Sequence, residues 1–194
     1  MSTGAVFGVI LGLICLVVVI LIVWGLLTYN RLVRQRNQVR ASWAQIDVQL
    51  KRRYDLIPNL VETVKGYAAH ERGTLEAVVA ARSGAVNAAE QGANPAQRAE
   101  AENMLTQTLG RLFALAENYP NLKANENFLS LQTELSGTED RIAYARQFYN
   151  SAVQTYNTSI QSIPTNVVAG VGGFKAEDLF QASGTERGPV QVQF

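Results

Sequence analysis

The strongest constraint in this chain is the run Ala5–Leu27, which contains no charged side chain. As an α-helix this run would be roughly 34 Å long, enough to cross about 30 Å of hydrocarbon. A secretory signal peptide is the alternative, but it needs a positively charged start and a cleavage site with small residues. Met1–Gly4 has no basic side chain and Leu26–Tyr29 offers no such site. We therefore predict a transmembrane helix over Ala5–Leu27, within an N-terminal segment of residues 1–28.

Basic residues flank this run on one side only. Arg31, Arg34, Arg36 and Arg40 follow it, whereas no charged residue precedes it. Because basic flanks stay on the cytoplasmic side, we predict a single-pass protein of the cytoplasmic (inner) membrane with its N-terminus outside. A second interpretation is that Arg31, Arg34 and Arg36 contact anionic lipids, at about 1 kcal/mol per basic residue near the surface. Both interpretations make membrane lipids a partner of the chain.

From Val39 onwards, apolar residues recur at intervals of three and four, as they do on the core-facing side of a helix. The pattern predicts one long helix over residues 29–90, with a break near His70–Thr74 as the alternative. Pro58 lies inside this helix, and an interior proline removes a backbone hydrogen bond and bends the helix. We therefore predict a kink over Asp55–Pro58.

Two further helical patterns follow. The first begins after the turn at Asn94–Pro95, with asparagine as N-cap and proline at the first helical position, and ends before Pro120. The second runs from near Leu122 to Pro164. Amphipathic helices bury their apolar stripes against one another. The prediction is an all-α fold in which the transmembrane helix precedes an elongated antiparallel bundle of three to four long helices, residues 29–163.

Residues 164–194 form a third segment with a different character. Its first part is rich in glycine yet apolar, and Lys175–Phe180 could form one helical turn. At the end of the chain, Val190, Val192 and Phe194 alternate with polar residues as an extended strand does. We predict a short irregular tail. These three side chains either contact a partner by adding to the edge of its sheet or belong to a frayed terminus.

No catalytic constellation is evident. With one histidine and one cysteine, a zinc site rich in nitrogen or sulfur is excluded in practice. His70–Glu71 begins like a metalloprotease motif, but Thr74 stands where the second histidine belongs. The net charge of +1 and the lack of a basic stripe beyond residue 53 argue against nucleic acid. We predict no enzyme activity, no cofactor, no metal and no small-molecule substrate.

Four stretches together resemble one family. They are Gln45–Arg53, Asp55–Val61, Asn118–Phe128 and Arg141–Arg146 with Tyr149–Asn150. The chain is similar over roughly residues 29–194 to the LemA family of bacterial membrane proteins. The resemblance implies one N-terminal span followed by a cytoplasmic helical bundle. It adds little to mechanism, because the molecular function of the family is unsettled.

The third of these stretches also has a local interpretation. Its motif residues are Asn118, Tyr119, Pro120, Lys123, Asn125 and Asn127. Tyr119–Pro120 is typical of a tight turn between helices. Lys123, Asn125 and Asn127 either cap the last helix or bind a partner, and capping is the preferred interpretation.

The functional hypothesis is a membrane-anchored scaffold that self-assembles on the cytoplasmic face and organises or shapes membrane or partner proteins. An adaptor for a membrane protease or transport complex, with a membrane protein as partner, is the second hypothesis, and an unrecognised enzyme is the third. A homo-oligomer is expected because a thin bundle cannot bury every large ring, and tyrosine suits interfaces. Gly4, Gly8 and Gly12 also allow close approach of helices in lipid. The tyrosines concerned are Tyr54, Tyr67, Tyr119, Tyr144, Tyr149 and Tyr156.

Overall fold

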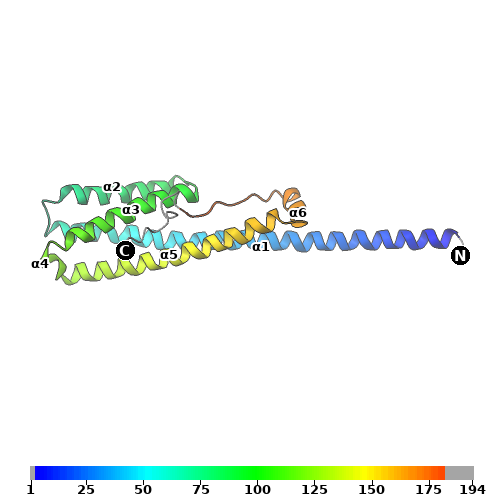
Figure 1. Cartoon of the computed structure of the whole chain (residues 1–194), viewed down its shortest axis with the longest axis horizontal. Helices are drawn as coiled ribbons and strands as arrows, with labels where there is room; N and C mark the ends of the chain where they lie inside the picture. The colour runs from blue at the N-terminus through cyan, green and yellow to red at the C-terminus, as the bar shows by residue number, and fades with distance from the viewer. Residues whose placement is uncertain (1–2, 182–194) are drawn as a thin grey trace, which may run out of the picture. The chain divides into compact units, whose positions relative to one another are not determined.

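The computed structural model describes residues 3–181, which form helices joined by turns and contain no strand. This confirms the predicted all-α class. Figure 1 shows the order of the helices along the chain. They are α1 (Thr3–Lys65), α2 (Arg72–Glu90), α3 (Pro95–Ala116), α4 (Pro120–Lys123), α5 (Glu126–Gln161) and α6 (Thr165–Val171).

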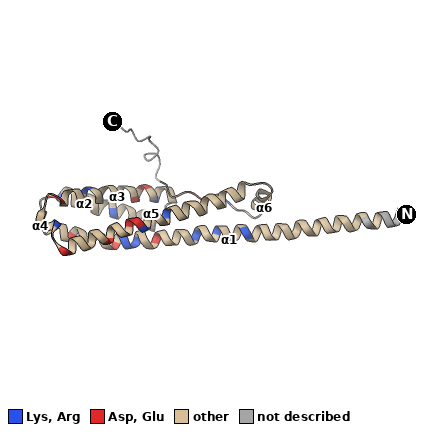
Figure 2. Cartoon of the chain, turned by 60° about the horizontal axis from the view of Figure 1, so that its bottom comes forward, with Lys and Arg blue, Asp and Glu red and all other residues tan. Residues whose placement is uncertain are grey.

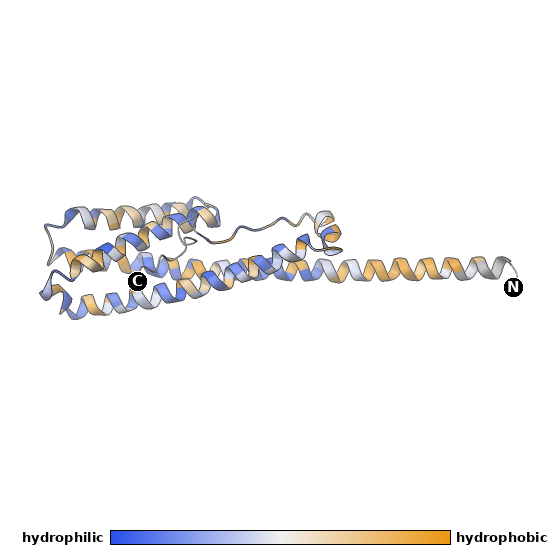
Figure 3. Ribbon diagram, in the orientation of Figure 1, coloured by the Kyte–Doolittle hydropathy of each residue, from blue (hydrophilic) through white to orange (hydrophobic). Residues whose placement is uncertain are grey.

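The first part of α1 is apolar and uncovered. It holds a segment long and apolar enough to cross a membrane, with a mean hydropathy of 3.2, and no side chain of that segment is buried in the protein. Figure 3 shows the unbroken hydrophobic stretch toward the N-terminal end of this helix. The predicted span Ala5–Leu27 lies inside α1.

The prediction of one helix over residues 29–90 is wrong. α1 ends at Lys65 and α2 begins at Arg72, and the residues between them turn through backbone hydrogen bonds from Tyr67 to Val64 and from Glu71 to Ala68. Glycine at position 66 weakens the helix at this point. Because the chain reverses direction after α1, α2 can pack along α3 and bury its apolar side chains. If α1 continued straight through these residues, the same side chains would lie in water. The alternative, a break near His70–Thr74, was close to the observed position.

Pro58 lies within α1, as predicted, and the kink itself stays a prediction. A proline has no N–H, so the carbonyl of Tyr54, four residues earlier, loses its usual helical donor. In the structure, Nε of Arg82 on α2 donates to this carbonyl at 2.8 Å. The proline therefore frees a backbone acceptor on α1 that a side chain of α2 uses.

The chain divides into two compact units. Unit 1 comprises the residues up to 41 and residues 152–177; unit 2 comprises residues 42–151 and those from 178 onward. The predicted boundaries at residues 28 and 163 stay predictions. In unit 1 the end of α5 and the short helix α6 pack on α1. Its buried side chains are Leu32, Val39, Val153, Tyr156, Ala169 and Phe174.

Unit 2 is built from the later part of α1, the helices α2, α3 and α4, and the first two thirds of α5. Successive long helices run in opposite directions (Figure 1), and their buried apolar side chains form the interior of the unit. Fully buried aliphatic side chains from three helices meet there: Ile46, Leu50 and Ile57 of α1, Leu105 and Leu112 of α3, and Leu135 of α5. The start of α3 confirms the predicted cap, because Asn94 and Gln97 form a reciprocal capping box ahead of Pro95.

The segment after Pro164 differs from its prediction. The helical turn lies at Thr165–Val171 rather than at 175–180, and residues 174–181 run without helix. The glycines at 172 and 173 end α6, and Gly173 has the positive φ of 67° that glycine adopts without strain. Beyond them, the chain is held by side chains of α5, which favours an extended path. The predicted tail contacts Val190, Val192 and Phe194 lie outside the described residues.

Candidate functional site

The interior of unit 2 contains a network of charged side chains. Arg53 of α1 is 1% exposed and forms ion pairs with Glu102 of α3 and Glu139 of α5. It also donates to Oγ1 of Thr106 at 3.0 Å. The hydroxyl of Tyr54 donates to the other oxygen of Glu102. One guanidinium thus joins three helices that are distant in sequence.

The network follows from the cost of burying charge. A lone ion in a protein interior loses its hydration, so buried charges persist only when they are paired and hydrogen-bonded. Arginine suits this position because its planar group offers several fixed donors at once. Burial, followed by the adjacent carboxylate of Glu102, raises the pKa of Tyr54 well above its usual range. Tyr54 is therefore protonated at neutral pH and acts as a hydrogen-bond donor.

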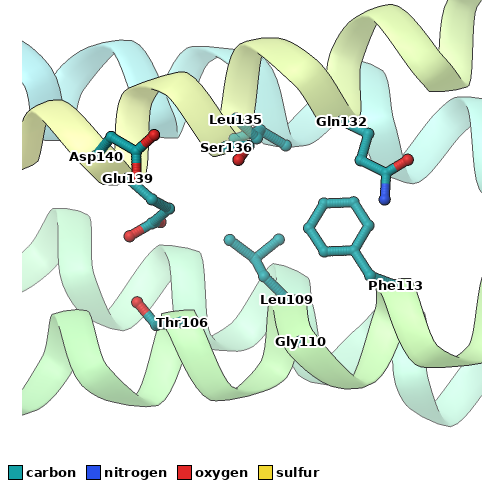
Figure 4. A pocket seen from close by; sticks show the side chains of 9 residues that line it. All are labelled: Thr106, Leu109, Gly110, Phe113, Gln132, Leu135, Ser136, Glu139 and Asp140. Atoms are coloured by element: carbon teal, nitrogen blue, oxygen red, sulfur yellow. The ribbon is translucent and has the colours of Figure 1, made fainter.

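A cavity opens beside this network between α3 and α5, with a volume of about 320 Å³. Figure 4 shows Thr106, Glu139 and Asp140 at one end and Phe113 with Gln132 at the other, with Leu109 and Leu135 between them. Glu139 and Thr106 belong to both the cavity wall and the Arg53 network. The cavity therefore has an apolar middle and a polar end. At that end the charge of Glu139 is neutralised by Arg53.

The apolar middle of this cavity suits the binding of an apolar group. Neither histidine nor cysteine lines it, and its Glu139 carboxylate is engaged by Arg53. In the described part of the chain, no three His, Cys, Asp or Glu side chains gather in a way that could hold a metal ion. His70 is exposed in the turn between α1 and α2. The arrangement holds helices together and leaves room for an apolar group.

The motif residues after α3 meet the turn between α1 and α2. The hydroxyl of Tyr119 donates to Glu71 at 3.1 Å, and Nδ2 of Asn125 donates to the hydroxyl of Tyr67 at 3.0 Å. Partial burial and the hydrogen bond to Glu71 raise the pKa of Tyr119. The side chain of Asn125 also accepts from the backbone N–H of Phe128, which caps α5.

The other residues of this motif lie on the surface. Lys123 forms an ion pair with Glu117, and Pro120 occupies the first turn of α4. Asn118, Pro120, Lys123 and Asn127 are all exposed. A role of these residues in binding a partner stays a prediction.

The arginines after the apolar segment do not share one environment. Arg31 and Arg34 are exposed, as is Arg40. Arg36 is partly buried in unit 1, where its guanidinium carbon lies 5.0 Å from the ring centre of Phe174. Arg36 therefore packs within the protein, in addition to the membrane role predicted for it. Lipid contact by the three arginines stays a prediction.

Unit 2 also has an exposed aromatic face on α1 and α5. We use this name for Val48, Tyr144 and Phe148, whose side chains are 64%, 75% and 42% exposed. Val48 and Tyr144 line a groove of about 490 Å³, whose other walls include Asp140 and Arg141. Figure 2 shows basic and acidic residues interspersed on these helices, whereas the apolar segment of α1 carries neither.

Arg53, Glu102 and Asn150 were not predicted as site residues. Arg53 and Glu102 each lie at core-facing positions of an otherwise apolar stripe, and a charge in such a position is the signal of a buried pair. The partner of Arg53 could not be read from spacing, because Glu102 and Glu139 lie 49 and 86 residues away. Asn150 binds the backbone of Phe180, a contact that depends on the path of the chain after α6.

Comparison with known proteins identifies relatives of this chain. The model described as the LemA family matches residues 42–194. A magnetosome protein, MamQ 1 of Paramagnetospirillum magneticum (strain AMB-1), is 30% identical over 178 residues, which is 80% of this chain and 65% of the relative. MamQ of Magnetospirillum gryphiswaldense is 29% identical with the same coverage. The chain thus spans less than two thirds of the length of these relatives. Protein LemA of Metamycoplasma hominis is 30% identical over 163 residues, 84% of this chain and 73% of that protein. This chain belongs to the LemA family.

Proposed function

We propose that this protein is a membrane-anchored, non-catalytic scaffold that self-assembles on the cytoplasmic face of the membrane and organises membrane or partner proteins there. The observation that carries the proposal is the exposed aromatic face of unit 2. Tyr144 and Phe148 are four residues apart on α5, so they lie on the same side of that helix. Val48 of α1 lines the same groove as Tyr144.

The composition of this face favours a second copy of the chain as its partner. Large aromatic side chains left in water are enriched at the centres of protein interfaces, where charge is depleted. Asp140 and Arg141 stand at the groove with opposite charges. A two-fold interface brings the same patch from both copies together, so a patch that carries both signs complements itself. A strongly charged partner would instead require a face of one sign.

The apolar segment of α1 supports the same proposal. Its side chains are uncovered over a length that suits a bilayer, which accounts for an apolar surface that a soluble protein would bury. Anchoring in a membrane raises the effective concentration of neighbouring copies without any new contact. A modest face can then suffice for assembly.

Substitutions in the exposed aromatic face test the proposal. Val48→Ser together with Tyr144→Ser should convert assemblies of the full-length protein in mild detergent to single chains near 21.2 kDa after the micelle mass is subtracted. Met104→Ser is the matched control, since Met104 is 59% exposed on α3, away from the groove. It should leave the assembly unchanged. Circular dichroism should show equal helix content in all three proteins.

Two outcomes would count against the scaffold. A wild-type protein that is a single chain at micromolar concentration, with no crosslinked dimer in native membranes, would refute self-assembly. Co-purification of another membrane protein in a fixed ratio with the wild type, together with its loss from the Val48→Ser, Tyr144→Ser variant, would support an adaptor in place of the scaffold.

A further inference from the structure

Residues 174–181 follow α6 and run without helix, and we call them the strap. Two phenylalanines anchor it, Phe174 at 9% exposure and Phe180 at 1%. An extended segment without a neighbouring strand must satisfy its backbone N–H and C=O groups in another way. In this protein, the N–H of Phe174 donates to the carbonyl of Ala169 in α6, and side chains of α5 bond the backbone of Glu177, Asp178 and Phe180.

Within unit 2, the backbone around Phe180 is held by specific hydrogen bonds from side chains of α5. The amide of Asn150 pairs with the backbone of Phe180 in both directions: its Oδ1 accepts from the backbone N–H at 2.9 Å, and its Nδ2 donates to the carbonyl at 3.3 Å. The hydroxyl of Tyr149 donates to the carbonyl of Asp178 at 2.8 Å. An asparagine side chain matches a peptide unit in this way whatever the residue that carries it.

The ring of Phe180 fills an aromatic pocket. It packs edge-on against Trp43 of α1, with ring centres 5.4 Å apart, and Arg146 of α5 lies 5.2 Å from its ring centre. Trp43 is itself held by Tyr149 and by Arg98. The four residues Trp43, Arg146, Tyr149 and Asn150 form what we call the strap clamp. Backbone bonds together with one aromatic pocket are the elements by which proteins recognise extended peptides.

The strap is joined to α6 through a flexible sequence. Gly172 and Gly173 precede Phe174, and Gly173 has a positive φ. The strap is held by the backbone hydrogen bond from Phe174 to Ala169, by side-chain hydrogen bonds with Tyr149, Asn150 and Asn157 of α5, and by the burial of its two rings. No backbone ladder of a sheet joins these residues to a helix, so release of the strap would leave the helices intact. An identical element that sits behind a pliable hinge is the usual starting point for exchange between copies.

From this geometry we infer that the strap clamp is a peptide-binding site for the strap of a second copy of this chain, which enters in place of the copy's own strap. The inference rests on the self-assembly proposed above and adds a second contact to it. The incoming segment meets the same Trp43 pocket and the same Asn150 amide, because its sequence is identical. Exchange therefore links copies without requiring a new complementary surface.

Photo-crosslinking in native membranes tests the exchange. One tagged full-length copy carries a photoreactive amino acid in place of Gln181, which is exposed beside the Phe180 anchor. It is co-expressed with a second, differently tagged full-length copy. We expect crosslinks between the two chains, mapped by mass spectrometry to the region around Trp43, Arg146 and Asn150 of the second copy.

Two variants report on the clamp and the anchor separately. Asn150→Leu in the receiving copy keeps the side-chain volume but removes both backbone bonds. Because the own strap and the incoming strap use the same clamp, crosslinks that map to the clamp of that copy should fall for both straps, by up to about tenfold. Phe180→Ala in the donating copy should lower the crosslinks of its strap to either clamp at least as much. Leu129→Ser in the receiving copy, at an exposed position of α5 away from the clamp, is the control and should change nothing. Since Asn150→Leu leaves the buried ring of Phe180 in place, its effect is readable even where Phe180→Ala disturbs folding.

Measurement of assembly mass on the same samples separates the two proposals. Assemblies that persist while Gln181 crosslinks only within its own chain would overturn the exchange and leave the scaffold standing. Crosslinks between chains that map away from the clamp, or that do not respond to Asn150→Leu, would also overturn it. Single chains without any crosslink between copies would overturn both.

Discussion

Arg53 places a positive charge inside the bundle, where most neighbouring side chains are aliphatic. Its pairing with Glu102 and Glu139 compensates the lost hydration, yet the two partners are not equivalent. The Glu102 side chain is 6% exposed, whereas that of Glu139 is 36% exposed. An ion whose partner is removed in a dry environment is far more costly than one that water can reach. The two carboxylates should therefore differ in their effect on stability.

Glutamine at these two positions tests the difference. Glu102→Gln removes the buried partner of Arg53 and leaves only the partly exposed Glu139, so it should lower the free energy of unfolding by about 3–5 kcal/mol. Glu139→Gln should lower it by about 1 kcal/mol, because Glu139 is partly exposed and Arg53 keeps its buried partner Glu102. Denaturant unfolding of the full-length protein in mild detergent, followed by circular dichroism, measures both. Equal losses would mean that burial does not govern the network.

At the scale of helices, proline and arginine act together across α1 and α2. Pro58 cannot donate to the Tyr54 carbonyl, and Arg82 does so in its place. Because the acceptor belongs to the backbone, the contact depends on the helical path rather than on a side chain at position 54. A local irregularity in one helix thus provides a docking point for its neighbour.

A double-mutant cycle tests this coupling. Arg82→Met in the wild type leaves the Tyr54 carbonyl without its donor and should cost about 1–2 kcal/mol. In a Pro58→Ala background the same change should cost less, because the new N–H at position 58 can donate to that carbonyl. Pro58→Ala should also straighten α1 if the predicted kink exists. Identical costs of Arg82→Met in both backgrounds would show that proline and arginine are independent.

At the scale of the whole molecule, one helix combines a membrane-spanning composition with a core-forming one. The change occurs where charged residues first appear, after Leu27. The described apolar side chains from Phe7 to Leu27 are uncovered, and from Leu32 onward apolar positions of the same helix begin to be buried by other parts of the chain. The arginines at this change determine the predicted orientation in the membrane.

Cysteine labelling tests that orientation. With Cys15 replaced by alanine, Ser2→Cys should react with a membrane-impermeant maleimide in intact cells, since the N-terminus is predicted to lie outside. Asn121→Cys, at an exposed position of α4, should react only after the membrane is permeabilised. Labelling of residue 121 from outside would reverse the predicted topology.

Much of the architecture was predictable because it depends on residues near one another in the chain. The all-α class follows from apolar residues at helical spacing. The start of α3 follows from Asn94 and Pro95, whose capping chemistry involves only the next few positions. The end of α3 before Pro120 has the same local origin. The family followed from motifs that are themselves contiguous.

Sequence patterns did not predict the features that depend on contacts between distant parts of the chain. Hydropathy alone located the apolar segment over Ala5–Leu27, because a bilayer selects for length and composition. Only tertiary packing decided that α1 stops at Lys65, since the gain comes from burying α2 against α3. Only the fold shows that Arg53 is an interior ion, because its partners come from two other helices. The strap likewise lies where it does because Asn150 and Trp43, from separate helices, receive Phe180.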